Sequence, residues 1–195
     1  MLTEEQKIGL GIALNEASLL GVSVDPESES AVVTFAPLSL PAEGPAQEGY
    51  EVRFLLKAVG RVVASLRMGR WNDPAARVAS INLGELQSTV QSFEGLPIYG
   101  WEFFDTADFG IESLGGRISL DWSGETGDTS HSLMLFQEGP DRHLDLFLWF
   151  DSFEIRGQNG DPIPIDAFIE GGKRWWDGLR CGDPRTKGQG IFPLK

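Results

Sequence analysis

The stretch from Glu51 to Met68 constrains the fold of this chain more than any other part of the sequence. Its even-numbered positions are apolar except for Gly60, and most of its odd-numbered positions are charged or polar. An alternation with a period of two is typical of a β-strand that has one buried face and one solvated face. We therefore predict that this stretch is extended and that its apolar face seals a hydrophobic core.

Gly60 interrupts this stretch, and two local structures fit the sequence there. The alternation keeps its phase on both sides of the glycine, whereas a two-residue hairpin would reverse it. Either one strand bends at a glycine bulge, or a three-residue loop joins two strands. In both cases the basic residues at odd-numbered positions should share one face, and these are Arg53, Lys57, Arg61 and Arg67.

The composition is that of a globular protein. A chain of 195 residues, of which 41% are hydrophobic, can bury a sizeable core, and this argues against disorder. No apolar run reaches the roughly 18 residues needed to span a bilayer, and the N-terminus lacks the basic region of a signal peptide. The single cysteine, Cys181, cannot form an internal disulfide, which favours a reducing compartment. We expect a cytoplasmic protein.

The net charge of −13 is distributed unevenly along the chain. Eleven acidic residues and one basic residue, Arg117, lie between Val78 and Asp141, whereas the C-terminal stretch 173–195 is basic. A field of negative sign repels nucleic acid and anionic membranes and favours cationic partners. We therefore expect a basic protein partner and neither nucleic acid nor a membrane. The alternative is that the acidity serves solubility alone.

Local patterns elsewhere predict further strands and helices. A helix should begin after Thr3, which forms a capping-box pattern with Gln6, and another after Asn82. A last helix should follow Asp166 and carry a buried stripe, which leaves one of Trp175 and Trp176 exposed. The segments with the residue pattern of strands are 19–24, 31–39, 98–104, 117–123, 132–137 and 144–155.

These elements predict the fold class. The alternation in the strand 144–155 shifts near Asp151, which suggests a bulge, and its apolar character places it beside the Glu51–Met68 stretch. Helices separated by groups of strands, with hairpins rather than regular βαβ units, indicate an α+β fold. We predict a single domain over residues 1–195, with a mainly antiparallel sheet of about seven or eight strands and two or three packed helices. Residues 178–195 should form a basic tail rich in glycine and proline.

The segment from Tyr99 to Glu112 is the strongest candidate for a binding site because it combines aromatic and acidic residues. In a strand, Trp101 and Phe103 would share one face, and Glu102 and Phe104 the other. An exposed aromatic pair flanked by carboxylates would suit a basic partner, since aromatic anchors dominate binding energy and charge speeds encounter. The alternative is that both pairs are buried. The predicted partner-binding residues are Trp101, Glu102, Phe104, Asp105, Asp108 and Glu112.

A weaker candidate site is the basic face of the Glu51–Met68 stretch. Arg53, Lys57 and Arg61 could together hold an anionic ligand. The alternative is that each basic residue pairs with an acidic residue on a neighbouring strand, as is common in sheets.

Motifs of catalysis and metal binding are missing from the sequence. It has no nucleophile elbow, phosphate-binding loop or dinucleotide fingerprint, and its acidic loops lack the spacing of an EF-hand. Its only histidines, His131 and His143, lie in no zinc-binding pattern and are interpreted as surface or strand-end residues. Cys181 is interpreted as an inert thiol. We therefore predict no catalytic residue, no metal site and no cofactor.

The sequence thus favours a non-enzymatic interaction protein that offers an acidic, aromatic surface to a basic protein, as an inhibitor, an immunity-type antidote or an adaptor would. Two alternatives remain open. A hydrolase-type enzyme using Asp or Glu residues within 99–128 would need a deep pocket with two carboxylates of raised pKa. A module for a small anionic ligand or a sugar would need the basic residues of the sheet to converge.

Overall fold

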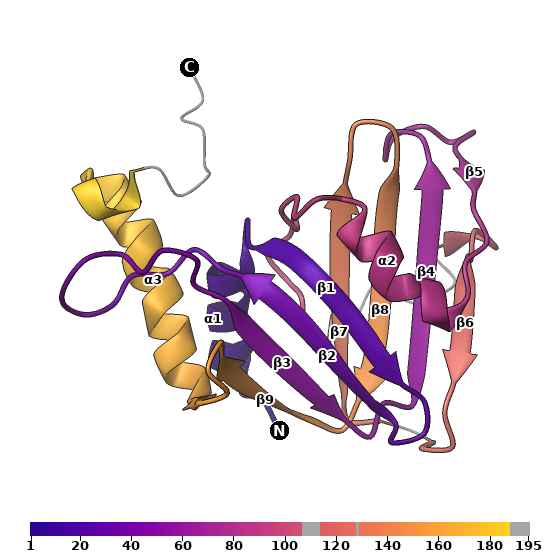
Figure 1. The fold of residues 1–195 in the computed structure, drawn as a ribbon, viewed down its shortest axis with the longest axis horizontal. Coiled ribbons are helices and arrows are strands. Elements are labelled where there is room, and N and C mark those ends of the chain that lie inside the picture. Colours follow the sequence, from indigo (N-terminus) through magenta and orange to yellow (C-terminus); the bar gives the residue numbers. More distant parts are fainter. Residues whose placement is uncertain (107–113, 128, 188–195) are drawn as a thin grey trace.

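The computed structural model describes residues 1–106, 114–127 and 129–187. These residues form ten β-strands in two antiparallel sheets, together with three α-helices (Figure 1). The α+β class and the antiparallel pairing predicted from the sequence are confirmed. The strands divide between two sheets, whereas the sequence suggested one larger sheet.

The first sheet contains the first half of the Glu51–Met68 stretch and the hairpin that precedes it. Its strands run in the order β1 (Ser18–Asp25), β2 (Ser30–Ala36), β3 (Val52–Lys57), β9 (Ser152–Gly157) and β10 (Pro162–Ile163). The second sheet has the order β5 (Arg77–Val78), β4 (Arg61–Met68), β8 (His143–Phe150) and β7 (His131–Glu138), and β6 (Leu120–Ser123) also pairs with β4.

Two neighbouring strands pass together from one sheet to the other. β3 continues into β4 through residues 58–60, and β8 continues into β9 through Asp151. The pairing is kept across this corner, because Asp151 N donates to the Lys57 carbonyl (3.1 Å) and Gly60 N donates to the Trp149 carbonyl (3.0 Å). The break at Gly60 is therefore a three-residue loop between two strands, and the irregularity at Asp151 is a change of sheet.

The main hydrophobic core extends through both sheets and lies on the predicted apolar face. Phe54 on β3 is fully buried at its centre. The Phe54 ring packs against Phe35, Phe153 and Phe168, with centroids 5.2–5.5 Å away. β4 differs from β3 because it is buried on both faces, and its odd-numbered Val63 packs in a smaller cluster on the outer face of the second sheet.

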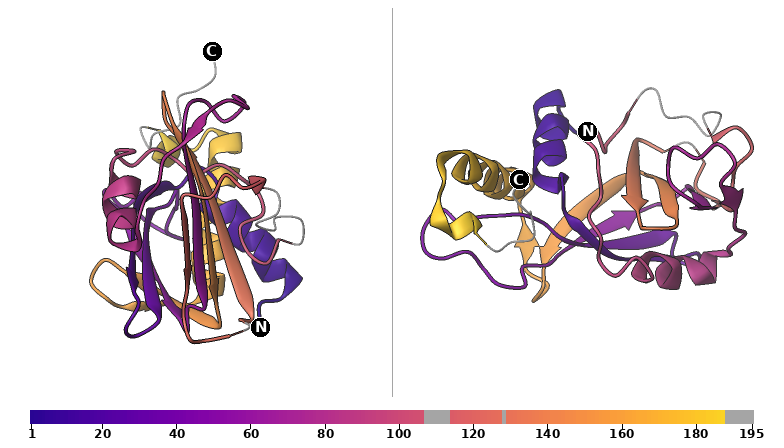
Figure 2. Two further views of the ribbon diagram at one scale, coloured as in Figure 1. Left: turned by 90° about the vertical axis from the view of Figure 1, so that its right-hand side faces the viewer. Right: turned by 90° about the horizontal axis from the view of Figure 1, so that it is seen from above.

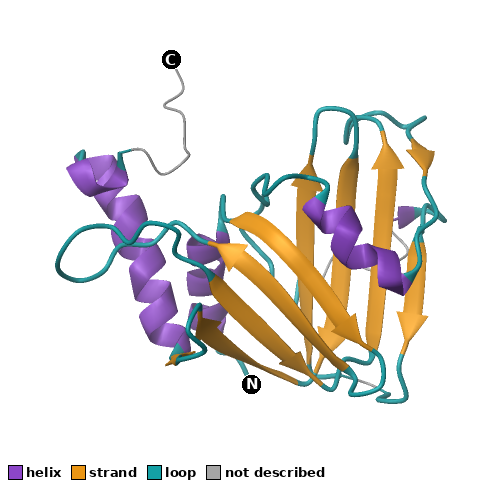
Figure 3. Ribbon diagram, in the orientation of Figure 1, coloured by secondary structure: helices purple, strands orange, loops and turns teal. Residues whose placement is uncertain are grey.

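The helices α1 (Glu4–Leu14) and α3 (Ile165–Cys181) pack against each other at one end of the molecule (Figure 3). The predicted capping box of α1 is present, since Gln6 N donates to Thr3 Oγ1 and Thr3 N donates to Gln6 Oε1. A Cβ atom at Gly172 would lie 2.6 Å from the Cα atom of Ala13, so only glycine allows this close approach.

This close packing changes the prediction for the last helix. Trp175 is buried, but Trp176 is half-buried rather than exposed, because its indole Nε1 donates to the Ile12 carbonyl of α1 (3.0 Å). The first part of the predicted tail is helical. Residues 178–181 belong to α3, and a 3-10 turn at Pro184–Thr186 follows.

The short helix α2 (Leu86–Gln91) follows a 3-10 turn and packs against β1. The predicted cap is present, as Asn82 Oδ1 accepts a hydrogen bond from Glu85 N (3.2 Å). α2 and α1 lie on opposite sides of the sheets (Figure 2). Within the described part of the chain, none of the helices has both the length and the apolar character needed to cross a membrane.

Candidate binding surface

The segment 98–105 runs along the outer edge of β7 as an irregular strand. Tyr99 N donates to the Phe136 carbonyl (3.1 Å), and Met134 N donates to the Phe103 carbonyl (2.8 Å). Residues 100–102 lie between these two bonds and bulge away from the edge, with Gly100 at a φ of 154°. The predicted strand 98–104 is therefore reduced to single bridges, because a bulge interrupts the ladder.

Trp101 lies on this bulge and projects from the molecule. Its side chain is 68% exposed, and Glu102 beside it is also exposed. The main chain of the bulge rests on α1, since a Cβ atom at Gly11 would come within 2.1 Å of the Trp101 carbonyl oxygen. The absence of a side chain at Gly11 therefore lets the bulge lie close to α1, while the indole of Trp101 points away from the core.

The structure corrects the role predicted for Phe104. Phe103 and Phe104 are both buried, and the Phe104 ring stacks on Phe153 with centroids 5.2 Å apart. The predicted alternation failed because the bulge at 100–102 breaks the two-residue period. Phe104 is a core residue and cannot offer its ring to a partner.

Asp105 fixes the end of this segment to the rest of the molecule. Its carboxylate accepts hydrogen bonds from Ser132 N (2.9 Å) and lies 3.0 Å from His131 Nδ1 and 3.4 Å from Lys7 Nζ. Burial disfavours the charged form of Asp105, but the hydrogen bonds from Ser132 and His131 and the nearby charges outweigh it and lower its pKa. Asp105 is thus a clamp that joins α1, β7 and the bulged segment.

Both histidines begin strands, His131 in β7 and His143 in β8, as the strand-end interpretation expected, but neither is a surface residue. His131 is buried against Asp105, and His143 is fully buried with its Nδ1 donating to the Gly69 carbonyl (2.8 Å). Their hydrogen-bond partners are 26 and 74 residues away in the sequence, so no local pattern indicated them. The predicted residues Asp108 and Glu112 lie outside the described residues.

Replacing Asp105 with asparagine should lower the free energy of unfolding by about 1.5–3 kcal/mol at neutral pH, the typical contribution of hydrogen bonds to a charged group. Asparagine tolerates the positive φ of this position (53°), so the change isolates the charge. Because the folded-state pKa of Asp105 is lowered, its contribution is complete above the unfolded value near 3.8 and disappears as the pH falls through the folded value. Urea denaturation of the wild type and the variant, at neutral pH and in acid, measures the difference in their free energies of unfolding. An equal difference at the two pH values would contradict the prediction.

The basic residues of the sheet do not converge on one point. Lys57 forms an ion pair with Glu154 in the first sheet, whereas Arg61 pairs with Asp121 in the second sheet (2.7 Å). Arg53 stands opposite Arg156 and forms no ion pair with any residue that the structure describes. This arrangement fits cross-strand pairing and does not support a common anion site.

Four large apolar side chains are exposed on segments that lie next to the bulge or to β7, and the sequence singled out only the two in the segment Tyr99–Glu112. Tyr99 and Trp101 lie on the bulged segment, and Ile8 lies on α1 one turn before Gly11, on which the bulge rests. Trp71 belongs to the loop after β4, where its backbone N donates to Glu138 Oε1 (3.3 Å). We define the aromatic surface as these four exposed residues, Ile8, Trp71, Tyr99 and Trp101. No periodic pattern connects them, since they come from three separate segments.

Carboxylates surround the aromatic surface. Burial of Tyr99, and then the negative charges of Glu16 and Glu138, raise the pKa of its phenol. Glu16 is half-buried, and burial raises the pKa of its carboxyl group. With Glu102 next to Trp101, the surface combines apolar rings with negative charge.

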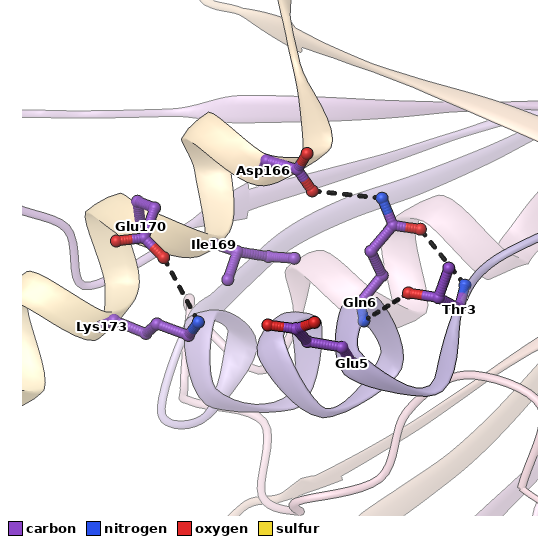
Figure 4. Close-up of a pocket in the computed structure, with 7 residues that line it drawn as sticks. All are labelled: Thr3, Glu5, Gln6, Asp166, Ile169, Glu170 and Lys173. Carbon is purple, nitrogen blue, oxygen red and sulfur yellow. Dashed lines mark hydrogen bonds and ion pairs between the residues drawn. The ribbon is translucent and has the colours of Figure 1, made fainter.

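A shallow depression of about 280 Å³ lies elsewhere, between the first turns of α1 and α3 (Figure 4). Its polar side chains are mostly bonded to one another: Gln6 Nε2 donates to Asp166 (3.1 Å), and Lys173 pairs with Glu170 (3.3 Å). None of its lining residues belongs to the region 99–128 in which the hydrolase alternative required a pocket. Its paired groups leave little free hydrogen-bonding capacity for a ligand.

The described residues contain no group of three histidine, cysteine, aspartate or glutamate side chains placed to hold a metal ion. No protein-family model matches the chain, and neither the curated proteins nor the solved structures gave a significant match.

Proposed function

We propose that this chain is a non-enzymatic, cytoplasmic interaction protein that binds a basic protein partner through its aromatic surface, in the manner of an inhibitor, an immunity-type antidote or an adaptor. The observation that carries this proposal is the presentation of Trp101. Its indole is largely exposed, while the backbone around it packs against Gly11 of α1 and is followed by the Asp105 clamp. An exposed tryptophan on a supported backbone supplies a large contact area, and tryptophan is enriched among the residues that dominate binding energy.

The charge of the molecule supports a cationic partner. The chain has a net charge of −13, and Glu16, Glu102 and Glu138 lie around the exposed rings. Negative charge at the rim of an apolar surface speeds association with a positive protein and disfavours nucleic acid.

Two carboxylates in the region 99–128, Asp105 and Asp121, lack the raised pKa that the hydrolase alternative required. The hydrogen bonds from Arg61 lower the pKa of Asp121, and the pKa of Asp105 is also lowered. A general acid at neutral pH needs the opposite shift. Both groups are instead held as anions by their partners.

Replacing Trp101 with alanine should weaken partner binding by about 30-fold or more, as expected for the loss of a hot-spot tryptophan of at least about 2 kcal/mol. The tagged protein would be used to capture partners from cells at low and high salt, and the captured protein would then be purified and titrated calorimetrically. Because Trp101 is exposed, the thermal stability of the variant should match that of the wild type.

The matched control is Leu179→Ala, which shortens another exposed apolar side chain, on α3 (38% exposed). This control should bind like the wild type. A basic partner that is released at high salt agrees with the proposal. Capture of acidic proteins only, or of none at either salt, would contradict it, as would full binding by the Trp101→Ala variant.

A further inference from the structure

Three segments of the chain meet around Tyr99. The Ala17 carbonyl accepts a hydrogen bond from Ile98 N (2.9 Å), which places the turn after α1 next to the tyrosine. Tyr99 N donates to the Phe136 carbonyl, two residues before Glu138 on β7. Glu16 and Glu138 therefore approach the exposed phenol from different elements.

Among the residues that the structure describes, neither carboxylate has a cationic partner. Glu16 is half-buried at a φ of 62° and makes no hydrogen bond or ion pair with a described residue. The Glu138 carboxylate accepts one hydrogen bond from the described residues, and its donor is the backbone N–H of Trp71. Partial burial without a counter-charge is unfavourable, and a cation arriving from outside would relieve it.

The side chain that best fits such a place is arginine. A guanidinium group can donate to two carboxylates while its flat face stacks on an aromatic ring. Trp101 is exposed on the same bulged segment as Tyr99, Ile8 on the helix that the bulge touches, and Trp71 on the loop that bonds to Glu138. The surroundings of Tyr99 therefore also offer apolar contacts. The complementary segment therefore carries arginine next to apolar residues.

We infer that the basic partner lays an arginine-containing segment with apolar neighbours across Ile8, Trp101, Tyr99 and Trp71, with one arginine at Tyr99 between Glu16 and Glu138. This inference rests on the proposed function and specifies its contact.

The test uses a ten-residue peptide that alternates arginine with leucine, titrated into the full chain and followed by NMR and calorimetry. The backbone amide signals of Ile8, Tyr99 and Trp101 and the indole signal of Trp71 should shift. The double variant Glu16→Gln/Glu138→Gln keeps a hydrogen-bond acceptor for Trp71 and should bind at least about tenfold more weakly. The control Glu43→Gln/Glu48→Gln removes the same charge from an exposed loop and should bind like the wild type.

Equal weakening by both double variants, or shifts confined to other surfaces, would overturn the inference. If Trp101→Ala abolishes capture of the cellular partner while Glu16→Gln/Glu138→Gln changes neither the capture nor the peptide titration, the inference fails and the proposed function stands. If Trp101→Ala leaves the capture intact, the proposed function itself fails.

Discussion

Replacing Phe54 with alanine is expected to lower the free energy of unfolding by about 3–5 kcal/mol, the range for a large aromatic side chain removed from a packed core. Phe54 is fully buried on β3, and its ring contacts rings from four other parts of the fold. These neighbours are Phe35, Phe104, Phe153 and Phe168. The substitution removes these contacts and leaves a cavity where the first sheet, the bulged segment and α3 meet.

Urea denaturation at neutral pH would measure this loss from the shift of the midpoint at constant slope. The matched control is Leu55→Ala on the same strand, because Leu55 is half-buried and points to the other face. Leu55→Ala should lower the free energy of unfolding clearly less than Phe54→Ala does. Comparable losses for the two variants would show that Phe54 does not lie at the centre of the core.

Replacing Asp145 with alanine is expected to lower the free energy of unfolding by about 3–5 kcal/mol, because it leaves a mostly buried guanidinium group without its partner. Asp145 on β8 is hydrogen-bonded to Arg67 on β4, and only 13% and 11% of the two side chains are exposed. The double variant Arg67→Met/Asp145→Leu should recover most of this loss, since an apolar pair of similar volume often replaces a buried ion pair without cost.

The control for this prediction is the exposed ion pair between Arg61, which lies on β4 like Arg67, and Asp121 on β6. Asp121→Ala removes the partner of Arg61, but these side chains are 38% and 40% exposed, so the expected loss is at most about 1 kcal/mol. Thermal and urea denaturation of the four proteins would separate the two cases. Equal losses for Asp145→Ala and Asp121→Ala would contradict the argument from burial.

Local patterns in the sequence predicted the elements better than their assembly. The alternation before Gly60 located the buried face of β3, and the cap residues Thr3 and Asn82 located two helix starts. The division into two sheets was not predictable, because alternation reports which face is buried and not which neighbours a strand has. The corner itself uses Ala58 at a φ of 51°, where glycine would have been the expected signal.

The candidate site shows the same limit. The sequence indicated that the segment containing Trp101 and Glu102 combines aromatic and acidic residues, and the structure leaves these two exposed. It could not show that Phe104 is buried, since the bulge at 100–102 depends on contact with α1. Ile8 and Trp71 were missed because only tertiary packing brings α1 next to the bulge and the loop of Trp71 next to β7.

The shared corner also determines when this chain can fold during its synthesis. β3 pairs with β9 at separations of 95–105 residues, and β4 pairs with β8 at separations of 76–88 residues. A nascent chain that ends before His143 therefore lacks one strand partner for β3 and one for β4. Closing so long a loop is entropically costly, and contacts of high sequence separation form slowly. The ribosome must therefore release residues up to Phe150 before the second sheet is complete, and up to Ile163 before the first sheet is complete. Until then the apolar face of β3 stays exposed, and exposed apolar surface of this kind makes folding intermediates prone to aggregate.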